Sequence, residues 1–186
     1  MEGSKLKKGQ VLIAEPALTG DLSFSRAVIL LAEHNEEGSV GFILNKPLEF
    51  TLNELVEDIK LPFPVYNGGP VEQDNIYFIH SVPMLIPGSI EISDGIFWGG
   101  NFKALLTAIE KDKIAKEDIR FFLGYTGWSQ NQLNGEIKSK SWISLENPNL
   151  KNLVKENSAF LWKKRIEALG GSYKIWSNTP ENPNLN

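Results

Sequence analysis

The sequence of 186 residues contains no cysteine. Disulfides, thiolate metal sites, iron–sulfur clusters and cysteine nucleophiles are therefore excluded. Histidine is scarce as well, with only two residues, His34 and His80. A zinc site would need both of them and a carboxylate, and their spacing matches no zinc-binding helix motif. The sequence thus predicts no metal site and no cofactor.

Long hydrophobic runs are also absent. The longest apolar run, residues 27–32, has six residues and is far too short to cross a membrane. Residues 1–8 are polar, and no apolar stretch long enough for a signal peptide follows them. We expect a cytoplasmic protein with no membrane association.

Basic residues are fewer than acidic ones: the chain has 19 basic and 23 acidic residues, which give a net charge of −4. An acidic protein is a poor match to the phosphate backbone of DNA, so the charge disfavours direct DNA binding. The balance differs along the chain: residues 101–186 carry 13 basic and 9 acidic side chains. This local basic excess keeps DNA binding as a minority hypothesis.

Alternating apolar patterns and turn residues predict strands and helices in mixed order. Two hairpins are expected, one from strands 26–34 and 39–45 and one from strands 89–92 and 96–98. Other predicted strands are 10–15, 65–67, 75–80, 119–125 and 140–144. Helices are expected near 51–59, 102–109, from 129, from 148 and over 158–169, with capping residues at several of their starts.

The order of strand 96–98, helix 102–109 and strand 119–125 is typical of a crossover unit, which places its two strands parallel. We therefore predict an α/β fold of the mixed α+β kind. It would be a layered αβα domain with a mixed sheet that contains antiparallel hairpins and at least one parallel crossover pair. The length suits one domain covering residues 1–186.

Known catalytic motifs are missing from the sequence. It has no Gly-x-Ser-x-Gly nucleophile elbow, no phosphate-binding lysine loop and no Gly-x-Gly-x-x-Gly. His34 and His80 lie at the ends of predicted strands, where a hydrogen-bonded structural histidine is the more common interpretation. The sequence favours a protein that is not an enzyme, with an unknown reaction at His80 or His34 as the alternative.

Glycines gather at three predicted corners, 67–70, 98–101 and 124–129, where a strand stops. Glycine allows a ligand to approach the backbone closely, although tight turns need glycine for steric reasons as well. An aromatic ring at Trp128 would cover a planar ligand or fill the core. Our candidate ligand-binding residues, which we expect to converge on one cleft, are Gly68, Gly69, Pro70, His80, Gly124, Gly127, Trp128 and Gln132.

A characteristic run of residues joins these features. Gly124-Tyr125-Thr126-Gly127-Trp128 is followed by Gln132-Leu133, Glu136-Ile137 and Trp142. This pattern resembles the signature of the YqgE/AlgH family of bacterial proteins. Further agreement covers nearly the whole chain in order: residues 12–16, 24–28, His34, 41–47, 68–71, His80, Trp162 and 180–186.

The chain departs from the family pattern at Thr126, where a small residue is usual, and at Gln130 and Asn131, where a Pro-Gly pair is usual. The resemblance implies a compact α/β layered domain with a mixed sheet. It implies no established activity, although the family is often labelled a transcriptional regulator.

Three kinds of function follow from these observations. The first is a small-molecule-binding or regulatory protein that uses the glycine corners and His80. The second is an enzyme of unknown reaction at His80 or His34, and the third is an adaptor that docks a protein partner through surface aromatics. We favour the first.

Overall fold

The computed structural model describes residues 6–16, 23–145 and 148–179. Within these residues ten strands form one connected sheet, with the order β10-β1-β2-β3-β9-β6-β8-β7, and β5 joins β4 to β9. The strands are β1 Val11–Ala14, β2 Val28–His34, β3 Gly38–Ile43, β4 Pro47–Thr51, β5 Pro64–Asn67, β6 Val71–His80, β7 Ile90–Ser93, β8 Ile96–Trp98, β9 Ile119–Ser129 and β10 Trp142–Leu145.

Six α-helices and one short 3₁₀ helix accompany the described strands, and the last three of them follow β10. They are α1 Leu52–Leu55, α2 Phe102–Glu110, η1 Lys116–Asp118, α3 Gln132–Lys138, α4 Leu150–Lys155, α5 Ser158–Leu169 and α6 Tyr173–Trp176. Asparagine caps begin α2, α4 and α5, where the side chains of Asn101, Asn149 and Asn157 accept backbone N–H groups. None of these helices has the length and apolar character that a membrane crossing requires.

Both predicted hairpins are confirmed. β2 pairs antiparallel with β3, with Leu30 opposite Phe42, and β7 pairs antiparallel with β8. The Asn35–Gly38 turn explains the first hairpin, because the Asn35 side chain accepts the backbone N–H groups of Glu37 and Gly38 at 2.8 and 3.2 Å.

The predicted fold class is wrong in its strand pairing. The sheet is mostly antiparallel, and the expected parallel crossover pair of strands 96–98 and 119–125 does not form. β6 lies between these two strands and pairs antiparallel with both. One parallel pairing occurs among the described strands, three residues of β5 against β9, and a single crossover helix does not join those strands.

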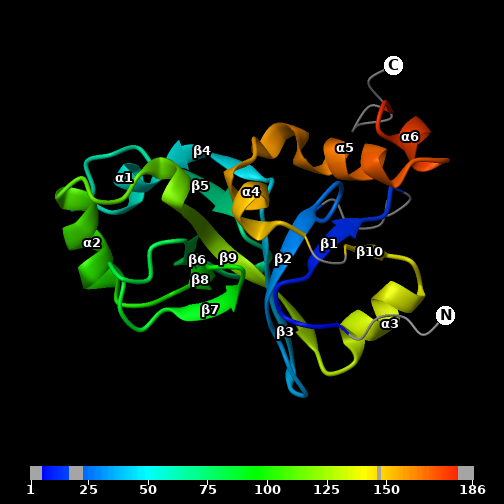
Figure 1. Ribbon diagram of the computed structural model, residues 1–186, viewed down its shortest axis with the longest axis horizontal. Coiled ribbons are helices and arrows are strands. Elements are labelled where there is room, and N and C mark those ends of the chain that lie inside the picture. Colours follow the sequence, from blue (N-terminus) through cyan, green and yellow to red (C-terminus); the bar gives the residue numbers. More distant parts are fainter. Residues whose placement is uncertain (1–5, 17–22, 146–147, 180–186) are drawn as a thin grey trace.

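The length of β9 explains much of the architecture. We expected its sequence to stop near Tyr125 and turn, but the strand continues to Ser129. Its first half pairs with β5 and β6, and its second half pairs with β3. This one strand therefore joins the two halves of the molecule (Figure 1). One half contains β1, β2, β3 and β10, and the other contains β4 to β8.

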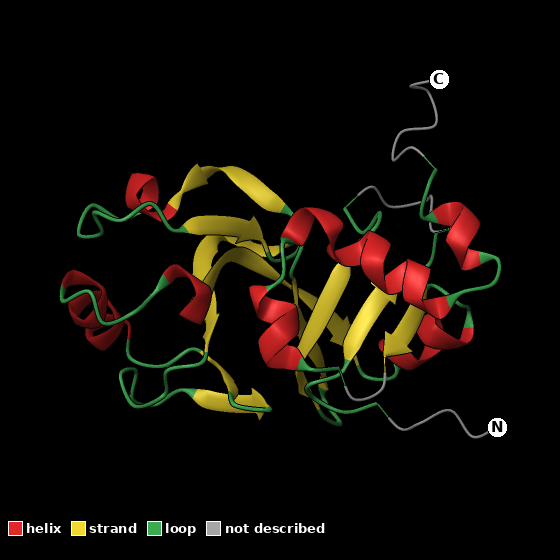
Figure 2. Cartoon of the chain, turned by 45° about the horizontal axis from the view of Figure 1, so that its top comes forward, coloured by secondary structure: helices red, strands yellow, loops and turns green. Residues whose placement is uncertain are grey.

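Helices cover both faces of the sheet. On one face, α4 and α5 pack over β1, β2 and β3, where Leu153, Leu161 and Trp162 meet Val11, Leu30 and other strand residues in one core cluster (Figure 2). The opposite face carries two clusters. One joins α3 to β1, β2 and β10, and the other joins α1 and α2 to β5, β6 and the first half of β9. Side chains that alternate along β9 supply both faces, as Phe121 and Phe122 do.

Candidate functional site

An open pocket of about 390 Å³ lies where the β2–β3 hairpin meets the second half of β9. Its rim and floor combine residues that are far apart in sequence: Glu33, Asn35, Glu37, Gly38, Ser39, Val40, Val71, Tyr125, Gly127 and Trp128. Tyr125 belongs to the third predicted glycine corner and Val71 directly follows the first, and the antiparallel pairing of β6 with β9 places them opposite each other.

The first and third glycine corners pack against each other. The Gly68 N–H donates to the Leu123 carbonyl at 2.8 Å, and the Thr126 hydroxyl donates to the Gly68 carbonyl at 3.2 Å. A Cβ on Gly68 would lie 2.2 Å from the carbonyl oxygen of Gly124, and one on Gly69 would lie 2.3 Å from the Tyr125 backbone. Glycine is needed here because two backbones touch, which explains these residues without a ligand.

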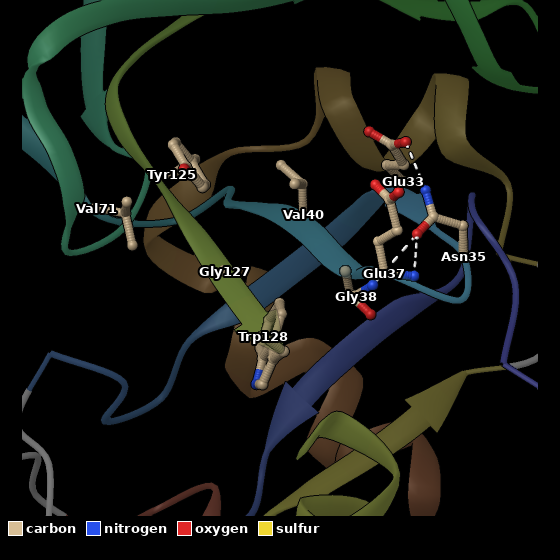
Figure 3. A pocket seen from close by; sticks show the side chains of 10 residues that line it. Glu33, Asn35, Glu37, Gly38, Val40, Val71, Tyr125, Gly127 and Trp128 are labelled. Atoms are coloured by element: carbon tan, nitrogen blue, oxygen red, sulfur yellow. Dashed lines mark hydrogen bonds between the residues drawn. The ribbon is translucent and has the colours of Figure 1, made fainter. Parts of the chain in front are cut away.

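Trp128 lies at the edge of the pocket, but its ring turns away from Tyr125 (Figure 3). The ring packs in the core cluster beneath α3 and is 6% exposed. Its indole N–H donates to Glu136 Oε2 at 2.8 Å, and the indole of Trp142 donates to the same oxygen at 2.7 Å. Of the two roles considered for this ring, the structure favours filling of the core.

Gln132 is hydrogen-bonded to the same carboxylate, that of Glu136. Its amide N–H donates to Glu136 Oε1 at 2.9 Å, and its carbonyl accepts the Ser129 N–H at 3.0 Å. We call Trp128, Gln132, Glu136 and Trp142 the indole–carboxylate cluster. The cluster joins β9, α3 and β10, so the most characteristic residues of the sequence hold the end of the sheet together. Gln132 does not line the pocket.

His80 does not reach this pocket. It lies at the far end of β6, opposite Ile119, whereas Val71 pairs with Tyr125. Their partners Ile119 and Tyr125 are six residues apart along β9, which corresponds to roughly 20 Å. The structure therefore does not contain the predicted single cleft, in which His80 and the glycine corners would meet.

The surroundings of His80 indicate a structural histidine. Its side chain is fully buried, its Nδ1 accepts the Val82 N–H at 3.3 Å, and its Nε2 lies 3.2 Å from the Gly99 carbonyl. The neutral form with hydrogen on Nε2 satisfies both contacts. Burial lowers the pKa of His80 below its ordinary value of 6.5, and the smaller effect of the Gly99 carbonyl opposes this.

His34 has a partner that the sequence did not reveal. Its Nδ1 lies 2.7 Å from the hydroxyl of Ser39, across the β2–β3 hairpin. Both residues line a second pocket of about 470 Å³ next to the first, between the hairpin and the start of α3. The predicted hairpin was the only signal for this contact, because it places positions 34 and 39 opposite each other.

The first pocket is electronegative. Glu33 and Glu37 line it, and no lysine, arginine or histidine is among the described residues that do so. Beside it the Tyr125 ring meets Tyr77 edge to face at 5.5 Å between ring centres, and the Tyr77 hydroxyl donates to Glu72. Burial, with help from Glu72, raises the pKa of Tyr77 to about 12. Within the described part of the chain, no three His, Asp or Glu side chains gather as metal ligands would.

The fold and the pocket define a small α/β protein on a mostly antiparallel sheet, with an open electronegative pocket between the β2–β3 hairpin and β9. The AlgH-like family matches residues 11–174. A protein of Cytophaga hutchinsonii is 40% identical over 184 residues, which cover 97% of this chain and 100% of that protein. One of Chlorobium limicola is 42% identical over 188 residues, covering 100% and 98%. Both are named UPF0301 proteins.

Two solved structures share the fold. The solution structure of the AlgH protein from Pseudomonas aeruginosa matches with a TM-score of 0.72 and 26% identity over 97% of this chain and 98% of that one. A crystal structure of a protein from Corynebacterium diphtheriae matches with a TM-score of 0.77 and 21% identity over 96% and 95%. The chain therefore belongs to the AlgH-like family, as its signature indicated. The relatives' names state no activity, so function must be argued from the site.

Proposed function

We propose that this protein is a small regulatory protein of the bacterial cytoplasm that binds a small molecule in the pocket between the β2–β3 hairpin and β9. The observation that supports this is the meeting of Val40, Val71 and Tyr125 around one open pocket. Two apolar side chains and an aromatic ring beside a few polar groups are the usual composition of a ligand site.

The charges of the pocket bear on the kind of ligand. Glu33 and Glu37 would repel an anion, and no basic side chain among the described lining residues compensates for them. The ligand is therefore neutral or cationic, with a flat or apolar part against Tyr125. An anion held at a glycine corner, which the sequence had suggested, fits this pocket poorly.

The test is a thermal-shift screen with organic amines, nucleosides and neutral metabolites, because a ligand that binds only the folded state raises the melting temperature. Replacing Gly127 by leucine would fill the pocket, since its Cβ would lie 3.4 Å from the Tyr125 ring. Gly135→Leu is the matched control, because a Cβ there meets no atom within 4 Å and the residue does not line the pocket.

We expect hits that stabilise the wild type and Gly135→Leu but leave Gly127→Leu unchanged. A screen with no hits, or hits that survive Gly127→Leu, would contradict the proposal. Direct DNA binding remains disfavoured by the overall charge. If the protein were instead an adaptor, an affinity pull-down would capture its protein partner, and the small-molecule screen would give no thermal shift.

An enzyme is the second candidate because of one observation, the 2.7 Å contact between His34 and Ser39. A histidine at this distance is placed to accept the proton of a serine nucleophile. Ser39 is only 5% exposed, which limits access to its hydroxyl. A fluorophosphonate probe decides this candidate: labelling of the wild type that Ser39→Ala abolishes supports it, and absence of labelling excludes it.

A further inference from the structure

The most deeply buried charge of the described chain is the guanidinium of Arg120, on β9. Arg120 is 7% exposed, and no carboxylate of the described residues lies at ion-pair distance from it. Its partners are backbone carbonyls: Nη1 donates to Leu44 at 2.7 Å, and Nη2 donates to Val154 at 2.6 Å and Glu156 at 3.3 Å. The guanidinium also stacks 4.6 Å from the centre of the Tyr66 ring.

These contacts satisfy three hydrogen bonds of the guanidinium but do not neutralise its charge. A guanidinium has five N–H donors, and the three bonds to carbonyls leave Nε and one N–H of Nη1 without an acceptor among the described residues. A buried cation is costly unless an opposite charge accompanies it. The pKa of Arg120 is accordingly lowered by burial, although the nearby Tyr66 opposes this effect.

An open pocket of about 430 Å³ adjoins Arg120 in the first half of β9. The pocket of the proposed function, which we call the hairpin pocket, lies at the second half of the same strand. Lys116 of η1 and Lys155 at the end of α4 also line the pocket beside Arg120, and neither makes a salt bridge to a described carboxylate. The pocket also includes Ser158, the first residue of the 12-residue helix α5, where the positive end of the helix dipole adds positive potential.

Two carboxylates line the same pocket and oppose an anion. That of Glu156 is occupied by Arg165 at 2.6 Å and Lys164 at 3.2 Å. Glu117 is the remaining negative charge, against Arg120, Lys116 and Lys155. The balance is positive, in contrast to the acidic hairpin pocket.

We propose that this pocket, lined by Arg120, Lys116 and Lys155, is a binding site for the phosphate group of a small metabolite. A phosphate dianion would supply the negative charge that Arg120 lacks and would accept from the two lysines. The volume holds a small phosphorylated molecule and is within the usual range for such sites. This site is separate from the hairpin pocket, so it stands or falls independently of the function proposed above.

The test is a titration with inorganic phosphate at constant ionic strength, in which NMR signals of the backbone amides and arginine side chains are measured at each step. Lys116→Gln/Lys155→Gln removes the two exposed cations without touching the buried Arg120. Lys113→Gln/Lys163→Gln is the matched control, since it removes two charges from residues that do not line the pocket. Sodium acetate in a parallel titration distinguishes a phosphate site from a general carboxylate site.

We expect saturable shifts at residues 116–120 and 154–159. Affinity should fall about tenfold or more in Lys116→Gln/Lys155→Gln and stay unchanged in the control. Non-saturating shifts, equal loss in both double variants, or tighter binding of acetate than of phosphate would each overturn the proposal.

Discussion

Glu136 is the residue whose replacement should reveal what the indole–carboxylate cluster contributes. Its Oε2 accepts the N–H groups of two nearly buried tryptophans. Glu136→Ala leaves both indoles without an acceptor, which we expect to lower the free energy of unfolding by about 2–4 kcal/mol. Urea denaturation measures this, with Glu167→Ala as control because that carboxylate makes one exposed salt bridge. Equal stability of the two variants would contradict a structural role for the cluster.

His80 predicts how stability depends on pH. Its pKa is lowered in the folded state by burial, so the unfolded chain binds the proton more readily. The stabilisation is complete above pH 6.5, the ordinary value, and is lost as the pH falls below it. Protonation would place a hydrogen on Nδ1, which now faces the Val82 N–H.

The slope of unfolding free energy against pH between 7 and 5 measures this effect. His80→Asn keeps an acceptor close to the position of Nδ1 but does not titrate, and should therefore show a shallower slope. His34→Asn serves as the control, because that histidine is only half-buried. If His80→Asn kept the slope of the wild type, His80 would not be the group responsible.

Individual site residues were predictable to different degrees. Asn101 caps α2 as its position before Phe102 indicated, because a cap depends only on neighbouring residues. Gln132 and Trp128 were chosen for a ligand but bond to Glu136 instead. Their spacing shows that they are close, but only packing decides whether a ring points to solvent or to the core.

Among the elements, β9 depends most directly on glycine. Gly124 has a φ of +70°, and a Cβ there would lie 2.6 Å from the Gly69 carbonyl oxygen and 2.7 Å from that of Val71. The contact is with backbone, which cannot move aside easily. We expect Gly124→Ala to lower the free energy of unfolding by about 3 kcal/mol or more, from the strain of φ together with the clash.

Gly135, inside α3, gives the opposite expectation. A Cβ there meets no atom within 4 Å, and alanine is the better helix former. Gly135→Ala should stabilise the protein by about 0.5–1 kcal/mol. Thermal or urea unfolding of both variants tests the pair, and a destabilising Gly135→Ala or a neutral Gly124→Ala would refute this account of the two glycines.

Elements closed by short turns were predicted well, and pairings of distant strands were not. The β2–β3 and β7–β8 hairpins follow from turns of a few residues. The neighbour of β9 was mispredicted because β6, which ends at His80 before both β7 and β8, inserts between β8 and β9. That choice rests on contacts such as Phe78 with Phe121, which no local pattern reports.

At the scale of the whole molecule, the shared sheet predicts a single cooperative unfolding transition. The core cluster beneath α4 and α5 includes Val11 and Phe122 and so reaches from β1 to β9, while the two clusters on the opposite face belong to different halves. Because β9 pairs with both halves, neither half keeps its central strand if the other unfolds.

Tryptophan fluorescence and far-ultraviolet circular dichroism can separate the halves. Trp128 and Trp142 lie in the cluster beneath α3, and Trp162 lies in the cluster beneath α4 and α5, whereas the cluster of α1 and α2 contains no tryptophan. Trp98 of β8 belongs to the other half, so the fluorescence is followed in a Trp98→Phe variant. Both signals should therefore change at the same urea concentration for a single domain covering residues 1–186. A fluorescence transition at clearly lower urea would show that the β1–β2–β10 half unfolds alone, and the chain would then be two cooperative units joined through β9.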